Sequence, residues 1–130
     1  MLTKILLALK KWALPLLVLY AFALTAGSLV NTGGMPDLGS SFDDKIYHAV
    51  AYSIFTILIY NVLKLKNFES RIFIAVVAVL VYGIIIEVLQ YLLTTYRTLD
   101  GYDILANSIG AILGMLLLWM RKEVKLKKNA

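Results

Sequence analysis

Side chains that can bind ions or move protons lie within and between two long apolar segments of the sequence. The stretch from Glu87 to Asn107 (EVLQYLLTTYRTLDGYDILAN) holds three carboxyl groups, two carboxamides and one guanidinium. A second group, Asp44, Lys45, His48 and Tyr52, lies at the start of an earlier apolar segment. An ionisable side chain at membrane depth costs at least about 2.5 kcal/mol, so a chain that keeps several uses them for pairing, transport or chemistry.

The composition assigns the chain to the integral membrane proteins. Of its 130 residues 61% are hydrophobic and only 16% are charged, which is more apolar surface than a soluble domain of this size can bury. There is no cysteine, which excludes disulfides, thiolate metal sites and thiol nucleophiles. The length allows a single domain over residues 1–130. The basic residues behind the net charge of +5 are distributed as in a membrane protein, around the apolar segments. We therefore expect membrane lipids and no nucleic acid as partners.

Four apolar runs predict an all-α protein with four transmembrane helices. A crossing needs about 20 residues at a rise of about 1.5 Å each. The predicted segments are Trp12–Val30, Ile46–Leu63, Ile72–Leu93 and Ile104–Met120. The second and fourth runs are short, and they reach the required length if Asp44 and Asp103 lie at the level of the lipid headgroups.

Basic residues predict the orientation of these helices. Eleven of the 13 lysines and arginines flank the chain ends or the second loop, and only Lys45 and Arg97 lie on the other side. The positive-inside rule therefore predicts cytoplasmic termini in a bacterial cytoplasmic membrane. In an alternative interpretation, Met1–Ala26 is a cleaved signal peptide, although its apolar stretch is long for one. Tyrosines near the helix ends, Tyr52, Tyr82, Tyr91, Tyr96 and Tyr102, are interpreted as an interfacial belt.

Helical spacing gathers the polar residues at the outward end of the bundle. His48 and Tyr52 follow Asp44 at intervals of four, so the three share a helix face. Glu87 with Gln90, and Asp103 with Asn107, form similar faces on the third and fourth segments. We expect these faces to line a small polar cavity that opens outward, with Arg97 and Asp100 above it.

Two glycines continue the Asp103 and Asn107 stripe along the fourth segment. Gly110 and Gly114 are spaced GxxxG, a pattern that lets helix backbones approach closely in lipid. The stripe is therefore predicted to pack against the other helices.

The same residues resemble a known family. The block DDKIYHAVAY, followed by IIEVLQYLLTTYRTLDGYDILANSIGAILG, resembles the VanZ-like family of small bacterial membrane proteins. The resemblance covers Asp43 to Gly114 and rests on the order and spacing of the polar positions named above. It implies a membrane protein of the cell envelope, with a possible link to resistance to the glycopeptide teicoplanin. It implies no agreed reaction.

The function must therefore follow from the chemistry of the site itself. The first hypothesis is the binding or processing of an anionic lipid or a lipid-linked cell-envelope precursor. His48, with Asp44 or Glu87, would act as the catalytic acid–base group. Arg97 and Lys45 would bind an anion, with Arg97 suited to bidentate contact. The remaining ligand-binding candidates are Tyr52, Gln90, Asp100, Asp103 and Asn107.

Two other hypotheses remain open. In the first, the polar cluster is a non-catalytic clamp that holds helix ends together. Such a clamp carries a desolvation cost that apolar residues would avoid. In the second, Asp44, His48, Glu87 and Asp103 bind a divalent ion, and with one histidine and no cysteine they would favour an oxygen-preferring ion. Paired carboxylates and basic residues already account for the charges, so we expect no metal and no other cofactor.

Overall fold

The computed structural model describes residues 1–30, 39, 42–95 and 99–130, and within them it contains four α-helices and no strand. All four helices are long and apolar enough to cross a membrane. The prediction of an all-α protein with four membrane-length helices is confirmed. The helices are α1 (Leu2–Leu29), α2 (Asp43–Leu65), α3 (Arg71–Leu93) and α4 (Gly101–Asn129).

Two helices extend well beyond the apolar runs that predicted them. α1 begins at Leu2 instead of Trp12, and α4 continues past Met120 to Asn129. The added segments are rich in leucine and lysine, which are strong helix formers, so the helices extend beyond the predicted apolar runs, before the run in α1 and after the run in α4. Because α1 begins early, Pro15 lies inside the helix and not near its start.

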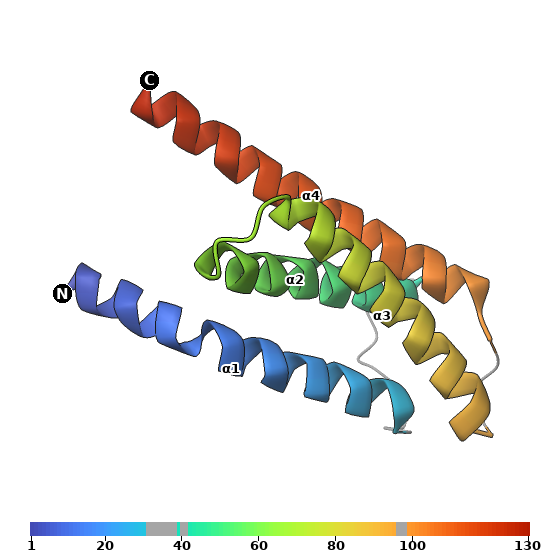
Figure 1. Cartoon of the computed structure of the whole chain (residues 1–130). Helices are drawn as coiled ribbons and strands as arrows, with labels where there is room; N and C mark the ends of the chain where they lie inside the picture. The colour runs from blue at the N-terminus through green and yellow to red at the C-terminus, as the bar shows by residue number, and fades with distance from the viewer. Residues whose placement is uncertain (31–38, 40–41, 96–98) are drawn as a thin grey trace.

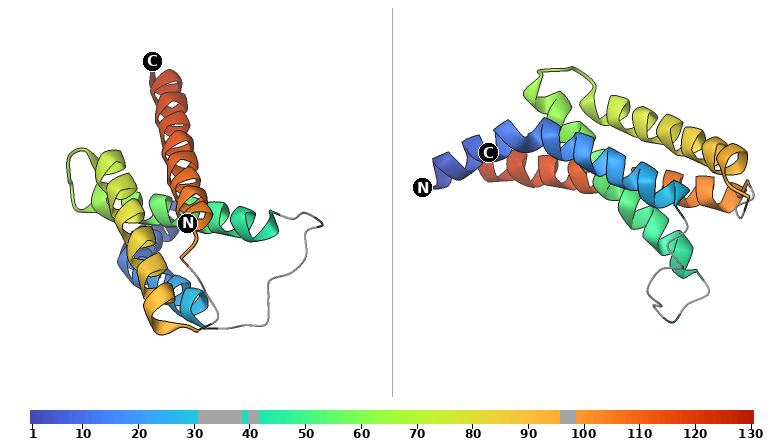
Figure 2. Two further views of the ribbon diagram at one scale, coloured as in Figure 1. Left: turned by 90° about the vertical axis from the view of Figure 1, so that its right-hand side faces the viewer. Right: turned by 90° about the horizontal axis from the view of Figure 1, so that it is seen from below.

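Successive helices run in opposite directions, so helix starts and helix ends alternate between the two ends of the bundle (Figure 1). The start of α1, the connection between α2 and α3, and the end of α4 lie at one end of the bundle. The starts of α2 and α4 and the end of α3 lie at the other end. α2 crosses α4 in both views of Figure 2, and α1 lies against α2 and α3.

Glycine lets α4 approach α2 backbone to backbone. An ideal Cβ placed on Gly110 would be 2.4 Å from the carbonyl oxygen of Ala49. One placed on Gly114 would be 2.9 Å from the carbonyl oxygen of Ser53 and 2.8 Å from Cβ of Thr56. Real Cβ atoms do not approach other atoms so closely, so any larger residue here would push the helices apart.

Aromatic rings fill the space between α1, α2 and α3. Tyr52 and Phe55 of α2 contact Tyr82 of α3, with ring centroids 6.2 and 4.8 Å from the Tyr82 ring. Tyr20 of α1 donates a hydrogen bond of 2.6 Å to the carbonyl oxygen of Ala51, and its ring lies 5.8 Å from Phe55.

The interpretation of the tyrosines as an interfacial belt is wrong for Tyr52 and Tyr82. Tyr52 is only 2% exposed, and Tyr82 packs against the buried core. Their hydroxyl groups do not need the headgroup region when a neighbouring helix offers partners, as Thr25 and the Ala21 carbonyl oxygen do for Tyr82. Tyr91 and Tyr102 are exposed, and Tyr96 lies outside the described residues.

The Gly110→Ala substitution should destabilise the protein by about 1–3 kcal/mol, because the new methyl group collides with the Ala49 carbonyl and α2 must move. Gly27→Ala is the matched control, since a Cβ at Gly27 would have nothing within 4 Å and alanine favours the helix by about 0.5–1 kcal/mol. Thermal unfolding in detergent compares the two variants. Equal effects would contradict the close approach of α2 and α4.

Candidate functional site

The candidate site is a cluster of polar side chains where α2 and α4 begin and α3 ends. Four of its members are almost fully buried: Glu87, Gln90, Asp103 and Asn107 have exposed fractions of 1 to 5%. The acidic residues of α2 and α4 lie in the first turns of their helices or at the N-cap, where carboxylates favourably face the positive end of the helix dipole. Local helix chemistry thus explains why these acids occur at this end of the bundle.

Lys45 joins α2 to α4 through ion pairs. Its Nζ lies 2.9 Å from Oδ2 of Asp100 and 3.3 Å from Oδ2 of Asp44, and it also contacts Oδ1 of Asp103. Asp103 has only 7% of its side chain exposed, so its charge depends on this partner. The ammonium that was predicted to bind an anion is therefore already paired with three carboxylates.

Asp100 combines a structural and an electrostatic role. It is the N-cap of α4, where its Oδ1 accepts a 2.9 Å hydrogen bond from the backbone N–H of Tyr102. The hydrogen bond from Lys45 lowers the pKa of the Asp100 carboxyl below its ordinary value, and the bond from Tyr102 lowers it further. Asp100 therefore stays ionised and holds the start of α4 against α2.

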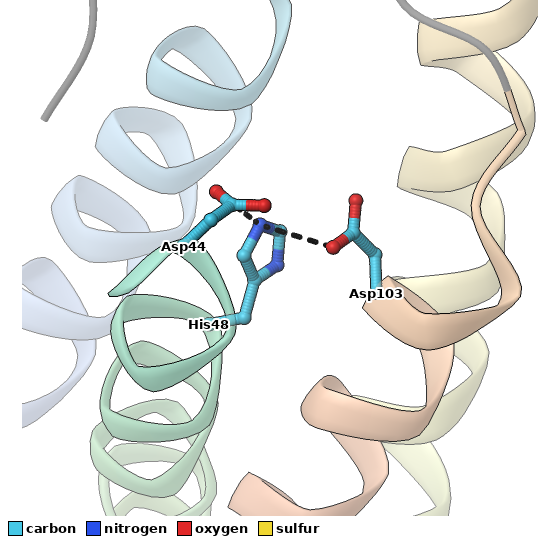
Figure 3. Close-up of side chains that lie close together, drawn as sticks. All are labelled: Asp44, His48 and Asp103. Carbon is cyan, nitrogen blue, oxygen red and sulfur yellow. Dashed lines mark ion pairs between the residues drawn. The ribbon is translucent and has the colours of Figure 1, made fainter. Parts of the chain in front are cut away.

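The imidazole of His48 lies between carboxylates of two helices (Figure 3). Its Nε2 is 3.5 Å from Oδ1 of Asp44 and 3.9 Å from Oδ1 of Asp103. On the opposite side, Nδ1 lies 2.9 Å from Oδ1 of Asn107. An amide oxygen only accepts, so with this amide orientation Nδ1 donates, and in the neutral ring Nε2 carries the lone pair that faces the carboxylates. The Tyr52 ring stacks on the imidazole at a centroid distance of 6.5 Å.

Asp44, His48 and Asp103 are close enough to share a cation. One potential ligand atom from each lies within 4.8 Å of the others. Two carboxylates and an imidazole form a plausible donor set for a divalent ion, and the Asn107 amide would orient the imidazole. The Lys45 ammonium contacts both carboxylates, however, so an ion would have to displace it.

Two buried polar atoms of the cluster have no hydrogen-bond partner in the described part of the chain. They are Oε1 of Glu87 and Nδ2 of Asn107. A Cβ placed on Gly83 would lie 3.2 Å from this Nδ2, so the amide faces α3. Glu87 is one turn further along the same face of α3. Both unpaired atoms therefore lie on the α3 side of the cluster.

Some predicted site residues take other places in the structure. Gln90 is buried, but its Nε2 donates a 2.8 Å hydrogen bond to the carbonyl oxygen of Ser28 and so links α3 to α1. Arg97 lies outside the described residues, and the outward cavity that it was predicted to cover stays a prediction. Thr25 and Ser28 of α1 contact α3, a role that no pattern in the sequence indicates.

The chain matches a known protein family. Residues 44–122 match the profile of the VanZ/LLP1 family, which is more than half of the chain and includes all of the cluster described above. No curated protein and no solved structure matches the chain.

Lys45→Met should lower the free energy of unfolding by about 1–3 kcal/mol, because three carboxylates lose their common counter-ion. The loss should fall short of that for a fully buried pair, since the Lys45 side chain is 28% exposed. Lys66→Met is the control, because it removes an equal charge from an exposed position. Thermal unfolding with and without added Mg²⁺ measures both effects, and Mg²⁺ should stabilise Lys45→Met alone. A Lys45→Met protein as stable as wild type would contradict the pairing.

Asp100→Asn should flatten the dependence of stability on acidic pH. The lowered pKa means that the folded state binds this proton less readily than the unfolded state, so the stabilisation is present above the unfolded value, near 3.9, and is lost as pH falls through the folded value. Asparagine keeps the N-cap acceptor, so only the charge pair is removed. Unfolding midpoints between about pH 3 and pH 7 measure this, with an expected difference of about 0.5 kcal/mol at neutral pH. Parallel curves for the two proteins would contradict the ion pair with Lys45.

Proposed function

The chain belongs to the VanZ/LLP1 family, and we propose that it binds the polar headgroup of a lipid or lipid-linked cell-envelope precursor at the polar cluster. The cluster lies at the end of the bundle where α2 and α4 begin, which the basic residues predict to face outward. In a bacterial cytoplasmic membrane this is the side where envelope precursors are used. Handling such a precursor would connect the protein to glycopeptide resistance, as its resemblance to VanZ implies.

The observation that carries the proposal is the pair of unpaired buried atoms. A carboxylate or amide that is buried without a hydrogen-bond partner costs about 1–3 kcal/mol, so a cluster that served only to hold helices together would be expected to pair its atoms. Oε1 of Glu87 needs a donor and Nδ2 of Asn107 needs an acceptor. A ligand hydroxyl group supplies both, so the geometry favours a headgroup that carries hydroxyls, such as a sugar or a glycerol.

The charge of the cluster limits where an anionic group of the ligand can bind. Among the described residues, the carboxyl groups of Asp44, Glu87, Asp100 and Asp103 outnumber the one ammonium. A phosphate would be repelled from the centre of the cluster. We propose that it binds at the outer rim, where Lys45 can exchange one carboxylate partner for the ligand. Arg97 stays an anion-binding candidate predicted from the sequence alone.

His48 is the group best placed to move a proton. Its Nδ1 is held by Asn107, which fixes the ring, and its Nε2 lone pair faces the carboxylates of Asp44 and Asp103. The carboxylates would stabilise the imidazolium that forms when Nε2 takes a proton from a ligand hydroxyl. If the ligand is processed as well as bound, His48 is the general base in this proposal, Asn107 positions its ring, and Asp44 stabilises the charge that forms on Nε2.

One observation favours the alternative of a structural clamp. Lys45 pairs across α2 and α4, and this bridge holds the two helices together without any ligand. The clamp explains Lys45, Asp100 and Asp103, but it gives no role to the unpaired atoms of Glu87 and Asn107.

Glu87→Gln separates the two functions. Its Oε1 makes no hydrogen bond to the described residues, so the nearly isosteric amide should leave the melting temperature unchanged or higher. Retention of a specific lipid should fall by about tenfold, since a hydrogen bond to a charged group contributes about 1.5–3 kcal/mol. Native mass spectrometry of protein released from membranes measures retention.

Ser108→Ala serves as the control. Ser108 is the neighbour of Asn107 on α4, and among the described residues its hydroxyl donates a hydrogen bond within the helix, to the Ile104 carbonyl oxygen. This variant should retain the lipid fully. If wild type carries only bulk phospholipid, or if Glu87→Gln retains the same lipid as wild type, headgroup binding at the cluster is wrong and the clamp stands.

A further inference from the structure

A second polar region lies at the other end of the bundle, away from the polar cluster. There the structure has a cavity of about 650 Å³ between the connection of α2 to α3 and the last third of α4. Five basic residues and one acidic residue line it: Lys64, Arg71, Arg121, Lys122, Lys125 and Glu69. These basic residues come from three separate segments, and the fold brings them to one place.

The positive charge of this cavity is not neutralised by the protein. Every ion pair among the described residues involves Lys45 or His48 at the opposite end, so none of the five basic side chains has a carboxylate partner there. Five cations with one nearby carboxylate attract an anion, and their attraction is stronger beside apolar protein and lipid than in water.

Arg71 is held in a position suited to an oxyanion. Its Nε donates a 2.7 Å hydrogen bond to the carbonyl oxygen of Phe68, which ties the guanidinium to the connecting segment. The terminal nitrogens keep their N–H groups for a phosphate, which a guanidinium binds in bidentate geometry. The first turn of α3 adds to this, because it has no acidic residue and no side-chain cap on its N–H groups.

The floor of the cavity is apolar. Leu118, which is 3% exposed, lies there with Tyr60 and Ile72. On α4 the next residues toward the C-terminus are Trp119, Met120 and then Arg121, so the cavity lies where the membrane-facing surface changes from apolar to charged. This is the depth of a phospholipid headgroup, with acyl chains on one side and water on the other.

We propose that this basic cavity binds the headgroup phosphate of an anionic phospholipid. The cations contact the phosphate, and the apolar floor accommodates the glycerol and the start of an acyl chain. A free phosphate or an acidic peptide would have no use for that floor. A zwitterionic lipid would bring its ammonium group against the five cations.

The test uses purified protein in detergent, to which phosphatidylglycerol or phosphatidylethanolamine is added. Native mass spectrometry and the melting temperature report binding. We expect phosphatidylglycerol to bind and to raise the melting temperature, and phosphatidylethanolamine to bind at least about tenfold more weakly. The double substitution Arg71→Gln with Arg121→Gln should weaken phosphatidylglycerol binding by at least about tenfold, since each cation near the surface contributes about fivefold.

Two further variants keep the test decisive. Lys122→Gln with Lys125→Gln removes two exposed cations of the cavity and does not touch the Arg71 hydrogen bond, so it should fold normally and still lose binding. Lys4→Gln with Lys10→Gln removes equal charge from α1 at the same end, outside the cavity, and should bind like wild type. The proposal is overturned if the cavity variants and the α1 variant lose phosphatidylglycerol binding equally, or if the two lipids bind equally well. It is also overturned if inorganic phosphate raises the melting temperature as much as phosphatidylglycerol does.

Discussion

The pairing of Lys45 with carboxylates of α2 and α4 is the interaction on which the polar end of this bundle depends. Asp103 is almost fully buried, and a lone carboxylate there would carry an uncompensated charge in apolar surroundings. The ammonium of Lys45 removes that penalty only if the starts of α2 and α4 lie side by side. The glycines of α4 make this possible, because at Gly110 the two backbones come into direct contact. Charge pairing and close packing therefore support one geometry.

The sequence predicts much of this arrangement, and the limits of the prediction have physical causes. Four apolar runs predict four helices, since a lipid-exposed backbone must satisfy its own hydrogen bonds. Intervals of four residues place His48 below Asp44 and Asn107 below Asp103, because helix geometry alone decides which residues share a face. The contact between His48 and Asn107 joins two such faces. Helix ends were harder to predict, since leucine and lysine continue a helix after it has left the apolar region.

The pairing of particular side chains could not be predicted from spacing. Gln90 lies on the expected face of α3, yet its amide binds the Ser28 carbonyl oxygen of α1. That choice depends on how α1 is rotated against α3, which local sequence does not encode. Tyr82 likewise finds Thr25 as a partner inside the bundle. The Thr25 hydroxyl costs little in a membrane helix and gives no strong signal in the sequence, although it links α1 to α3.

The contact between α2 and α4 also decides how a membrane-embedded molecule can reach the polar cluster. Side gates in helical membrane proteins open when bulky side chains at a seam change rotamer or when neighbouring helices slide. At Gly110 and Gly114 the backbone of α4 lies directly against carbonyl groups of α2, so sliding would drive a carbonyl into the opposite helix. The unpaired atoms of Glu87 and Asn107 lie on the α3 side. Under the proposed function, a lipid that enters sideways would therefore pass along α3, while the contact between α2 and α4 would form a fixed wall of the entrance.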